Sequence, residues 1–143
     1  MADLRPLIRL HRWRLDEKQR TLSELRGHED HLINESAQLE EEIKTEQHAV
    51  HGNFEVSFGY AAFARAAIGR RQRLAAALEE IRSRIAAATD ALAEAFQELK
   101  RYELAQEERV KQEKLKLKHK ENELLDETAA IGFQRKQQEA SEN

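Results

Sequence analysis

Histidine and carboxylate side chains are the groups of this 143-residue chain that could do chemistry, and two histidine pairs have helical spacing. His28 precedes His31 by three positions, as His48 precedes His51. On a helix, such a pair places two imidazoles on one face, where a metal ion could bind. Zinc needs a third and a fourth ligand, and only scattered acids such as Glu24 stand nearby. We therefore interpret the histidines as solvated and expect no metal.

Other signatures of catalysis are missing. The chain has no cysteine, which removes a thiol nucleophile, a disulfide and a zinc–thiolate site. Its five glycines are scattered and form no phosphate-binding loop. The carboxylates are abundant but belong to polar helical faces, where no concave pocket would raise a pKa. We expect no enzyme activity and no cofactor.

An arginine cluster, RRQR at residues 70–73, suggests nucleic-acid binding. The formal net charge of −3 gives the chain no basic character overall, and no aromatic stacking platform is interleaved with these arginines. We interpret the cluster as the partner of an acidic helix face and expect no nucleic-acid partner.

The composition is that of long helices. Charged residues make up 36% of the chain, the mean hydropathy is −0.82, and there is one proline. Abundant Ala, Glu, Lys, Leu and Arg with apolar residues at helical spacing is typical of coiled coil. The apolar runs are far shorter than the roughly 20 residues that span a bilayer, and the start lacks the apolar core of a secretory signal. A cytoplasmic protein is therefore expected.

A heptad seam, the stripe of positions spaced alternately by four and three, runs through residues 4–50. Nine of its fourteen positions are apolar. They are Leu4, Ile8, His11, Leu15, Lys18, Leu22, Leu25, Glu29, Leu32, Ser36, Leu39, Ile43, Glu46 and Val50.

A second seam begins after an interruption at residues 51–59 and is apolar or aromatic at all nine positions. It comprises Leu74, Leu78, Ile81, Ile85, Ala88, Leu92, Ala95, Leu99 and Tyr102. Two steps of four through Gln106 to Val110 form a stutter. Beyond it one apolar residue recurs per heptad, at Val110, Leu117, Leu124 and Ile131.

Folding the chain near residue 55 places residues whose numbers sum to about 110 side by side. Leu32 then lies near Leu78, and the acidic residues 35–46 face the arginines at 65–73. Such complementary charges set orientation and register in coiled coils. We predict an all-α fold, an antiparallel coiled-coil hairpin whose longer second helix overhangs the first by some 25–30 residues, about 40 Å. The alternative is a longer homodimeric coiled coil.

The predicted hairpin is a single domain over residues 1–143. Its first helix covers about residues 4–51, a loop about 52–57, and the second helix about 58–136, followed by a frayed tail at 137–143.

Half of the aromatic residues gather beside the predicted loop, in GNFEVSFGYAAF at residues 52–63. Gly52 and Asn53 suit a turn. Because the neighbouring residues are mostly small, the rings of Phe58, Tyr60 and Phe63 cannot all be covered by one helix. Partly exposed aromatics beside small residues are typical of protein interfaces, so we expect a partner to dock here.

Four blocks of the chain, in this order, resemble the flagellar export protein FliJ family, particularly its alphaproteobacterial branch. The blocks are LRPLIRLHRWRLDEKQRTLSEL, FGYAAFARAAIGRRQRL, AFQELKRYELAQEER and NELLDETAAIGFQRK. Each block alone is ordinary coiled-coil sequence, and the resemblance rests on the set.

The resemblance implies a non-enzymatic stalk of the type III protein export apparatus, similar to the central stalk subunit of rotary ATPases. It implies that one end binds the hexameric export ATPase, that the other contacts the cytoplasmic domain of the export gate, and that export chaperones are further partners. The expected location is the cytoplasmic face of the inner membrane near the flagellar base, with peripheral association only.

The resemblance also implies binding residues. The expected gate contacts near the loop are Phe58, Tyr60, Phe63, Ala67 and Leu74. The expected ATPase contacts on the overhang are Val110, Leu117, Leu124, Asp126, Glu127, Ile131 and Arg135. Gly132 departs from an uninterrupted helix, because a glycine inside a helix costs about 1 kcal/mol relative to alanine.

Two other functions are alternatives. A general coiled-coil chaperone or scaffold, such as a prefoldin-like protein, would need apolar residues spread along its exposed surface. Here they concentrate at one end. The stalk of an injectisome is similar in sequence and is the second alternative.

Overall fold

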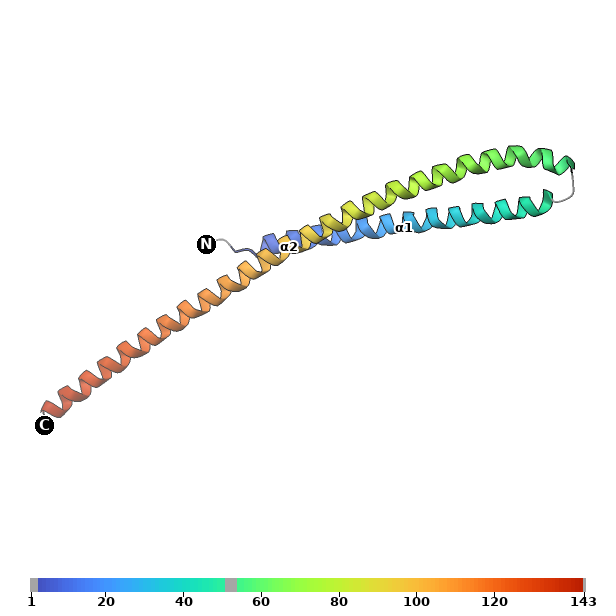
Figure 1. Cartoon of the computed structure of the whole chain (residues 1–143). Helices are drawn as coiled ribbons and strands as arrows, with labels where there is room; N and C mark the ends of the chain where they lie inside the picture. The colour runs from blue at the N-terminus through green and yellow to red at the C-terminus, as the bar shows by residue number, and fades with distance from the viewer. Residues whose placement is uncertain (1–2, 51–53, 143) are drawn as a thin grey trace. The chain divides into compact units, whose positions relative to one another are not determined.

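The chain folds into two long helices (Figure 1). The computed structural model describes residues 3–50 and 54–142, with side chains in the second helix described from Gly59 onward. Helix α1 covers Arg5–Val50, 46 residues, and α2 covers Phe54–Glu142, 89 residues. The predicted all-α antiparallel hairpin with a longer second helix is confirmed.

The helix bounds differ from the expected ones at α2. This helix begins at Phe54, four residues before the expected start, and continues to Glu142 through the stretch expected to fray. Gly132 does not interrupt it, since one glycine lowers helix stability without preventing helical geometry. Gly52 and Asn53, expected in the turn, lie outside the described residues.

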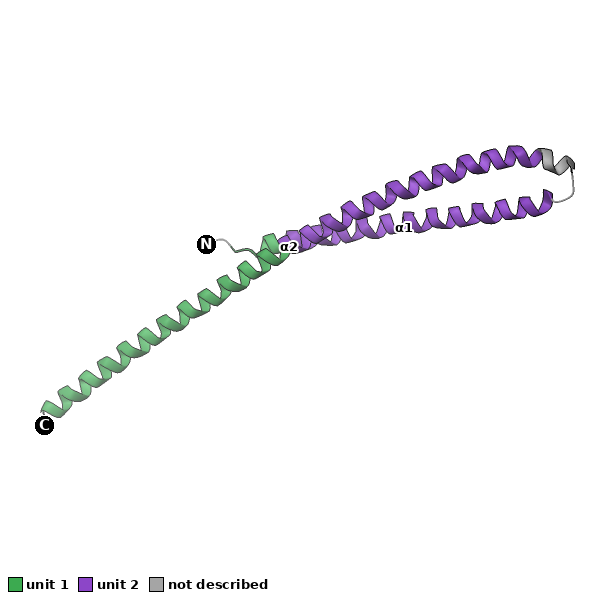
Figure 2. Cartoon of the chain, in the orientation of Figure 1, with its two compact units in different colours: residues 1–9, 99–143 green, residues 10–98 purple. Residues whose placement is uncertain are grey.

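Two compact units divide the chain, Leu10–Glu98 and Met1–Arg9 with Leu99–Asn143 (Figure 2). In Leu10–Glu98, unit 2 of Figure 2, α1 and α2 run side by side in opposite directions. Its core cluster consists of Leu39, Ala67 and Leu74, with Leu39 only 2% exposed. Leu32, Ile43 and Phe63 pack against this cluster.

Nearly all positions of the two predicted seams are covered. On α1, thirteen of the fourteen seam positions are buried or half-buried, and Lys18 alone is exposed; on α2, all nine are covered. His11 takes a seam position with 6% exposure, and its Nδ1 lies 4.0 Å from a carboxylate oxygen of Glu98. The period of the sequence pattern therefore locates the buried face of both helices.

Ion pairs between the helices report their register. Arg71 binds Glu40 with two hydrogen bonds of 2.7 and 2.9 Å, and Arg82 Nε lies 3.2 Å from Glu29. The residue numbers of each pair add to 111, close to the predicted 110. Exposed pairs of this kind contribute about 0.2–1 kcal/mol each, so they select the register more than they stabilise the fold.

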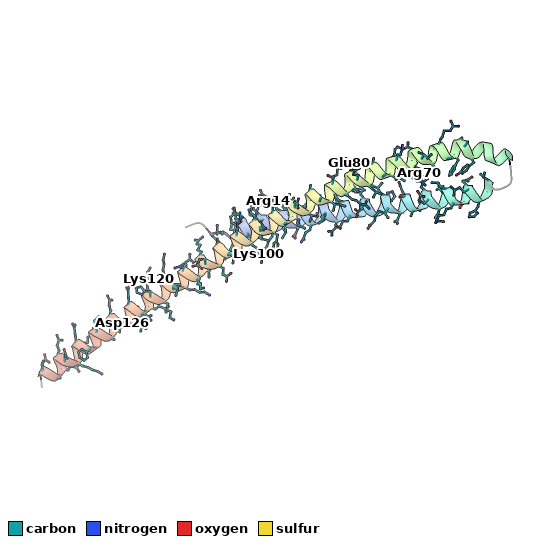
Figure 3. All side chains as sticks on the ribbon, viewed as in Figure 1. Arg14, Arg70, Glu80, Lys100, Lys120 and Asp126 are labelled. Carbon is teal, nitrogen blue, oxygen red and sulfur yellow. The ribbon has the colours of Figure 1, made fainter. Side chains whose placement is uncertain are left out.

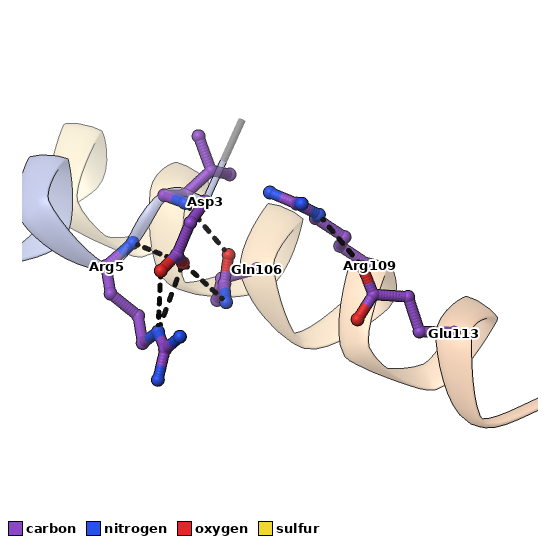
Figure 4. A network of polar contacts seen from close by, with 6 residues as sticks. Asp3, Arg5, Gln106, Arg109 and Glu113 are labelled. Carbon is purple, nitrogen blue, oxygen red and sulfur yellow. Dashed lines mark hydrogen bonds and ion pairs between the residues drawn. The ribbon is translucent and has the colours of Figure 1, made fainter. Parts of the chain in front are cut away.

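The start of α1 is attached to α2 within unit 1 of Figure 2 (Figure 4). The backbone N–H of Leu4 donates to Oε1 of Gln106 at 3.2 Å, and Nε2 of Gln106 donates to Asp3 at 3.4 Å. Asp3 accepts from the backbone N–H of Arg5, a capping contact that, with the Arg5 guanidinium, holds the pKa of Asp3 below its usual 3.8. Gln106 is therefore the α2 residue that bonds the chain at the start of α1.

Removing the Leu39 side chain tests the core cluster formed with Ala67 and Leu74. Leu39→Ala should lower the free energy of unfolding by about 2–5 kcal/mol, because it leaves a cavity among Ala67, Leu74 and their neighbours. Urea denaturation followed by circular dichroism measures this change. Leu104→Ala is the matched control, since Leu104 is 63% exposed and its truncation should cost far less. Equal losses for the two variants would contradict the assigned core.

Gln106→Ala tests the attachment of the α1 start. Because the bond to the Leu4 N–H and the bond to Asp3 are both lost, backbone amides of residues 7–10 should exchange about 2- to 10-fold faster, as expected for 0.5–1.5 kcal/mol. Gln112→Ala is the control, because Gln112 donates only to Glu108 on its own helix. Unchanged exchange in Gln106→Ala would show that these hydrogen bonds do not hold the end of α1.

Candidate functional site

The histidines lie apart from any metal-like arrangement in the described chain. His31 Nε2 lies 2.9 Å from a carboxylate oxygen of Glu35, one turn further along the same helix. His28 and His31 line a surface groove together with Glu24 and Arg84. Over residues 3–50 and 54–142, no three side chains of the metal-binding types come together. His51 lies outside the described residues.

The arginine cluster faces acids of α1. Arg71 binds Glu40, and Arg70 Nη1 lies 3.5 Å from Glu42 (Arg70 is labelled in Figure 3). The pairing of these two arginines with the acidic stretch of α1 is confirmed. Their positive charges are thus partly compensated within the hairpin.

The aromatic end of α2 is half core and half surface. Tyr60 and Phe63 are half-buried, with ring centroids 6.2 Å apart at an interplanar angle of 35°. Phe63 packs against the core cluster. The side chain of Phe58 lies outside those described. The rings of Tyr60 and Phe63 therefore have one covered and one accessible side.

Two surface grooves flank Phe63. One is lined by Ala37, Glu41 and Thr45 of α1, and the other by Ile43 and Gln47 of α1 with Tyr60 and Ile68 of α2. Together they form a concave surface on each side of one aromatic ring, a geometry that suits the insertion of a partner side chain.

Two residues expected as gate contacts lie inside the core. Ala67 is 6% exposed and Leu74 is 7% exposed. A partner bound to the intact hairpin meets them only indirectly, through the side chains that they position. Sequence reasoning missed Ile68, which is 52% exposed beside the second groove. Its signal was available, because Ala67 stands one heptad before the seam residue Leu74, and Ile68, the next residue along the helix, points to a different face.

The overhang, defined here as residues 110–142 of α2, is exposed throughout. Val110 is 38% exposed, Leu117 60%, Leu124 65% and Ile131 54%. Within its own unit no other helical segment runs beside these residues (Lys120 and Asp126 in Figure 3). The apolar stripe, defined as these four residues at heptad spacing, is bare.

The covered face of α2 ends at Arg109, one residue before Val110, the last position of the expected stutter. Gln106 and Arg109 are half-buried, whereas Val110 is exposed. The Arg109 side chain is only 20% exposed, and its Nε lies 3.4 Å from Glu113. A groove beside it is lined by Leu4, Gln112 and Lys116. The overhang thus begins at a concave surface.

The polar residues expected to bind the ATPase are accessible. Asp126, Glu127 and Arg135 are all exposed, and none forms a hydrogen bond or ion pair within the described chain. Three further apolar residues of the overhang, Leu115, Leu125 and Phe133, are 55–66% exposed but do not belong to the apolar stripe. They lie off the heptad spacing, which is why the seam pattern did not select them.

The family described as flagellar FliJ protein matches residues 1–138. The chain belongs to this family. The predicted resemblance is confirmed over nearly its whole length. No curated protein and no solved structure matches significantly.

Membership makes the chain a component of flagellar protein export. The family is one of non-catalytic export components. No helix in the described part of the chain has both the length and the apolar character to cross a bilayer.

Proposed function

We propose that the chain is a non-enzymatic stalk that connects the export ATPase ring to the export gate and promotes export of flagellar subunits. The observation that carries this proposal is the bare apolar stripe of the overhang in a chain of the FliJ family. The protein acts at the cytoplasmic face of the inner membrane, near the flagellar base, through protein contacts alone. Export chaperones are further partners.

The overhang is the segment that binds the ATPase ring. A partner that covers Val110, Leu117, Leu124 and Ile131 gains about 1.5–3 kcal/mol for each side chain before the cost of ordering. Asp126, Glu127 and Arg135 supply charges at the rim of that contact, where they set orientation and association rate. A single helix is also narrow enough, about 10–12 Å, to enter the centre of a protein ring.

The aromatic end of the hairpin binds the cytoplasmic domain of the gate. The accessible sides of Tyr60 and Phe63 and the exposed Ile68 form the contact, with the two grooves beside Phe63 receiving partner side chains. Ala67 and Leu74 support this surface from within the core. Phe58, which lies in the same aromatic stretch, belongs to the proposed contact by sequence position.

Charge in the stripe tests the ATPase contact. Leu117→Asp combined with Leu124→Asp should abolish binding to the purified ATPase and stimulation of its activity. In the complex, two carboxylates would replace apolar side chains that the ATPase buries. Circular dichroism should show a folded hairpin, since both leucines are exposed.

The matched control for the stripe is Leu115→Asp combined with Asn122→Asp. Residues 115 and 122 are seven positions apart, as 117 and 124 are, and the substitutions add the same charge. Because they lie on the opposite side of the helix, ATPase binding should persist. Undiminished stimulation by the double variant in the stripe would remove the stalk assignment.

Loss of the accessible rings tests the gate contact. Tyr60→Ala combined with Phe63→Leu should weaken binding to the gate domain and reduce motility, while ATPase stimulation persists. Leucine at 63 keeps an apolar group against the core cluster, so that helical content is retained. Ile33→Ala, an exposed apolar residue elsewhere on α1, is the control for nonspecific loss. Full gate binding by the aromatic variant would refute the assignment.

A further inference from the structure

The overhang carries its charges in two blocks of opposite sign. Residues 111–120 contain five lysines and one glutamate, whereas residues 121–130 contain four acidic residues and no lysine or arginine. With histidine neutral, the first block has a net charge of +4 and the second of −4. The boundary lies between Lys120 and Glu121.

Few of these charges are used within the molecule. Glu113 pairs with Arg109, and Glu123 lies 3.1 Å from His119. Lys114, Lys120, Glu121 and Glu127 form no ion pair or hydrogen bond among the described residues, and all are exposed. Two compact groups of opposite charge therefore stand in solution on one helix.

The apolar stripe is symmetric about the same boundary. Val110 and Ile131 lie equally far from the point between Lys120 and Glu121, as do Leu117 and Leu124. Reversing the direction of the helix about that point therefore superimposes apolar on apolar positions and exchanges the basic block with the acidic one.

We propose that the overhangs of two copies of this chain pair antiparallel, with a two-fold axis between Lys120 and Glu121. Residues whose numbers sum to 241 then lie at the same level. Leu117 meets Leu124 of the second copy, and Val110 meets Ile131. The contact is isologous, so it closes as a dimer and does not propagate.

The polar layers between the apolar ones agree with this arrangement. Lys114 and Glu127 lie three or four residues from stripe positions, on the same helix face, and share a level across the pair. Lys120 and Glu121 share the central level. From residue 110 to 131, this register places no two like charges at one level.

Parallel pairing is disfavoured by the same charges. Two copies aligned in parallel and in register would place five lysines beside five lysines and four acids beside four acids. Such like-charge contacts are destabilising in coiled coils. The order of the charges thus selects one direction, which the apolar stripe alone does not.

The inference rests on the order of charges and apolar residues and does not depend on the proposed function. If the stripe also binds the ATPase, the two contacts use the same side chains and exclude one another. Self-pairing would then keep the stripe covered in chains that are not bound to the ring.

Single cysteines test the direction of pairing, since the natural chain has none. Glu121→Cys lies next to the axis, within about 1.5 Å of its copy along the helix direction, and should form a disulfide-linked dimer under mild oxidation. Thr128→Cys is the matched control on the same helix face. In the antiparallel pair it lies about 22 Å from its copy, far beyond the roughly 7 Å between Cα atoms that a disulfide spans.

Charge exchange tests the complementarity. Lys114→Glu with Lys120→Glu makes one variant, and Glu121→Lys with Glu127→Lys makes the other. Each alone should sediment as a monomer where the natural chain forms a dimer, because like charges then share each level. An equimolar mixture should recover the dimer, since all four pairs between unlike copies are again of opposite sign.

Three results would overturn the inference. They are a monomer at every concentration of the natural chain, equal crosslinking of the two cysteine variants, or a mixture no more dimeric than its components. ATPase binding by a chain that never dimerises would overturn self-pairing alone. Dimerisation without ATPase binding would leave self-pairing intact and remove the stalk assignment.

Discussion

The packing of two antiparallel helices along one seam is the interaction on which the rest of the structure depends. In proteins, most of the stability of a helix comes from tertiary packing of its apolar face, and here each helix covers the seam of the other. The helices differ in length, 46 residues against 89, so α1 can cover only part of α2. The length difference creates the overhang, and the seam determines which of its faces is apolar.

Charge plays a different part in the two halves of α2. Where α1 is present, exposed pairs such as Arg71–Glu40 contribute little free energy, but they form only in the register that brings the opposite charges together. On the overhang, no second helix of the same unit supplies opposite charges. There the lysines gather in residues 111–120 and the acids in residues 121–130. The same physical rule that sets the hairpin register therefore governs what can bind to the overhang.

Much of the fold could be predicted because the seam and the charges are periodic properties of the sequence. Nearly every position that the alternation of four and three selected is covered, and the opposite charges located the register. Contacts that depend on one side chain were not predictable. Gln106, which bonds the start of α1, is a polar residue at a step of the predicted stripe, and Arg109 is half-buried where the pattern selected Val110.

The candidate sites were harder to predict than the fold. On α2, the drop from two apolar residues per heptad to one separated the covered part of the helix from the exposed overhang. Near the loop, exposure depends on how two helices approach each other. Phe63, Ala67 and Leu74 looked like one surface in the sequence, yet Ala67 and Leu74 are core residues and Phe63 belongs to both core and surface. Small residues between aromatics indicate a close helix contact as readily as a binding surface.

A stripe with one apolar residue per heptad suits reversible contacts. A full seam of two per heptad, as in the hairpin, buries its face permanently in the folded state. The overhang has half that density, so each contact gains less free energy per turn and the bare helix stays soluble through its many charges. A helix that exchanges partners needs this balance, because more apolar residues would make the first contact permanent and fewer would leave nothing to bind.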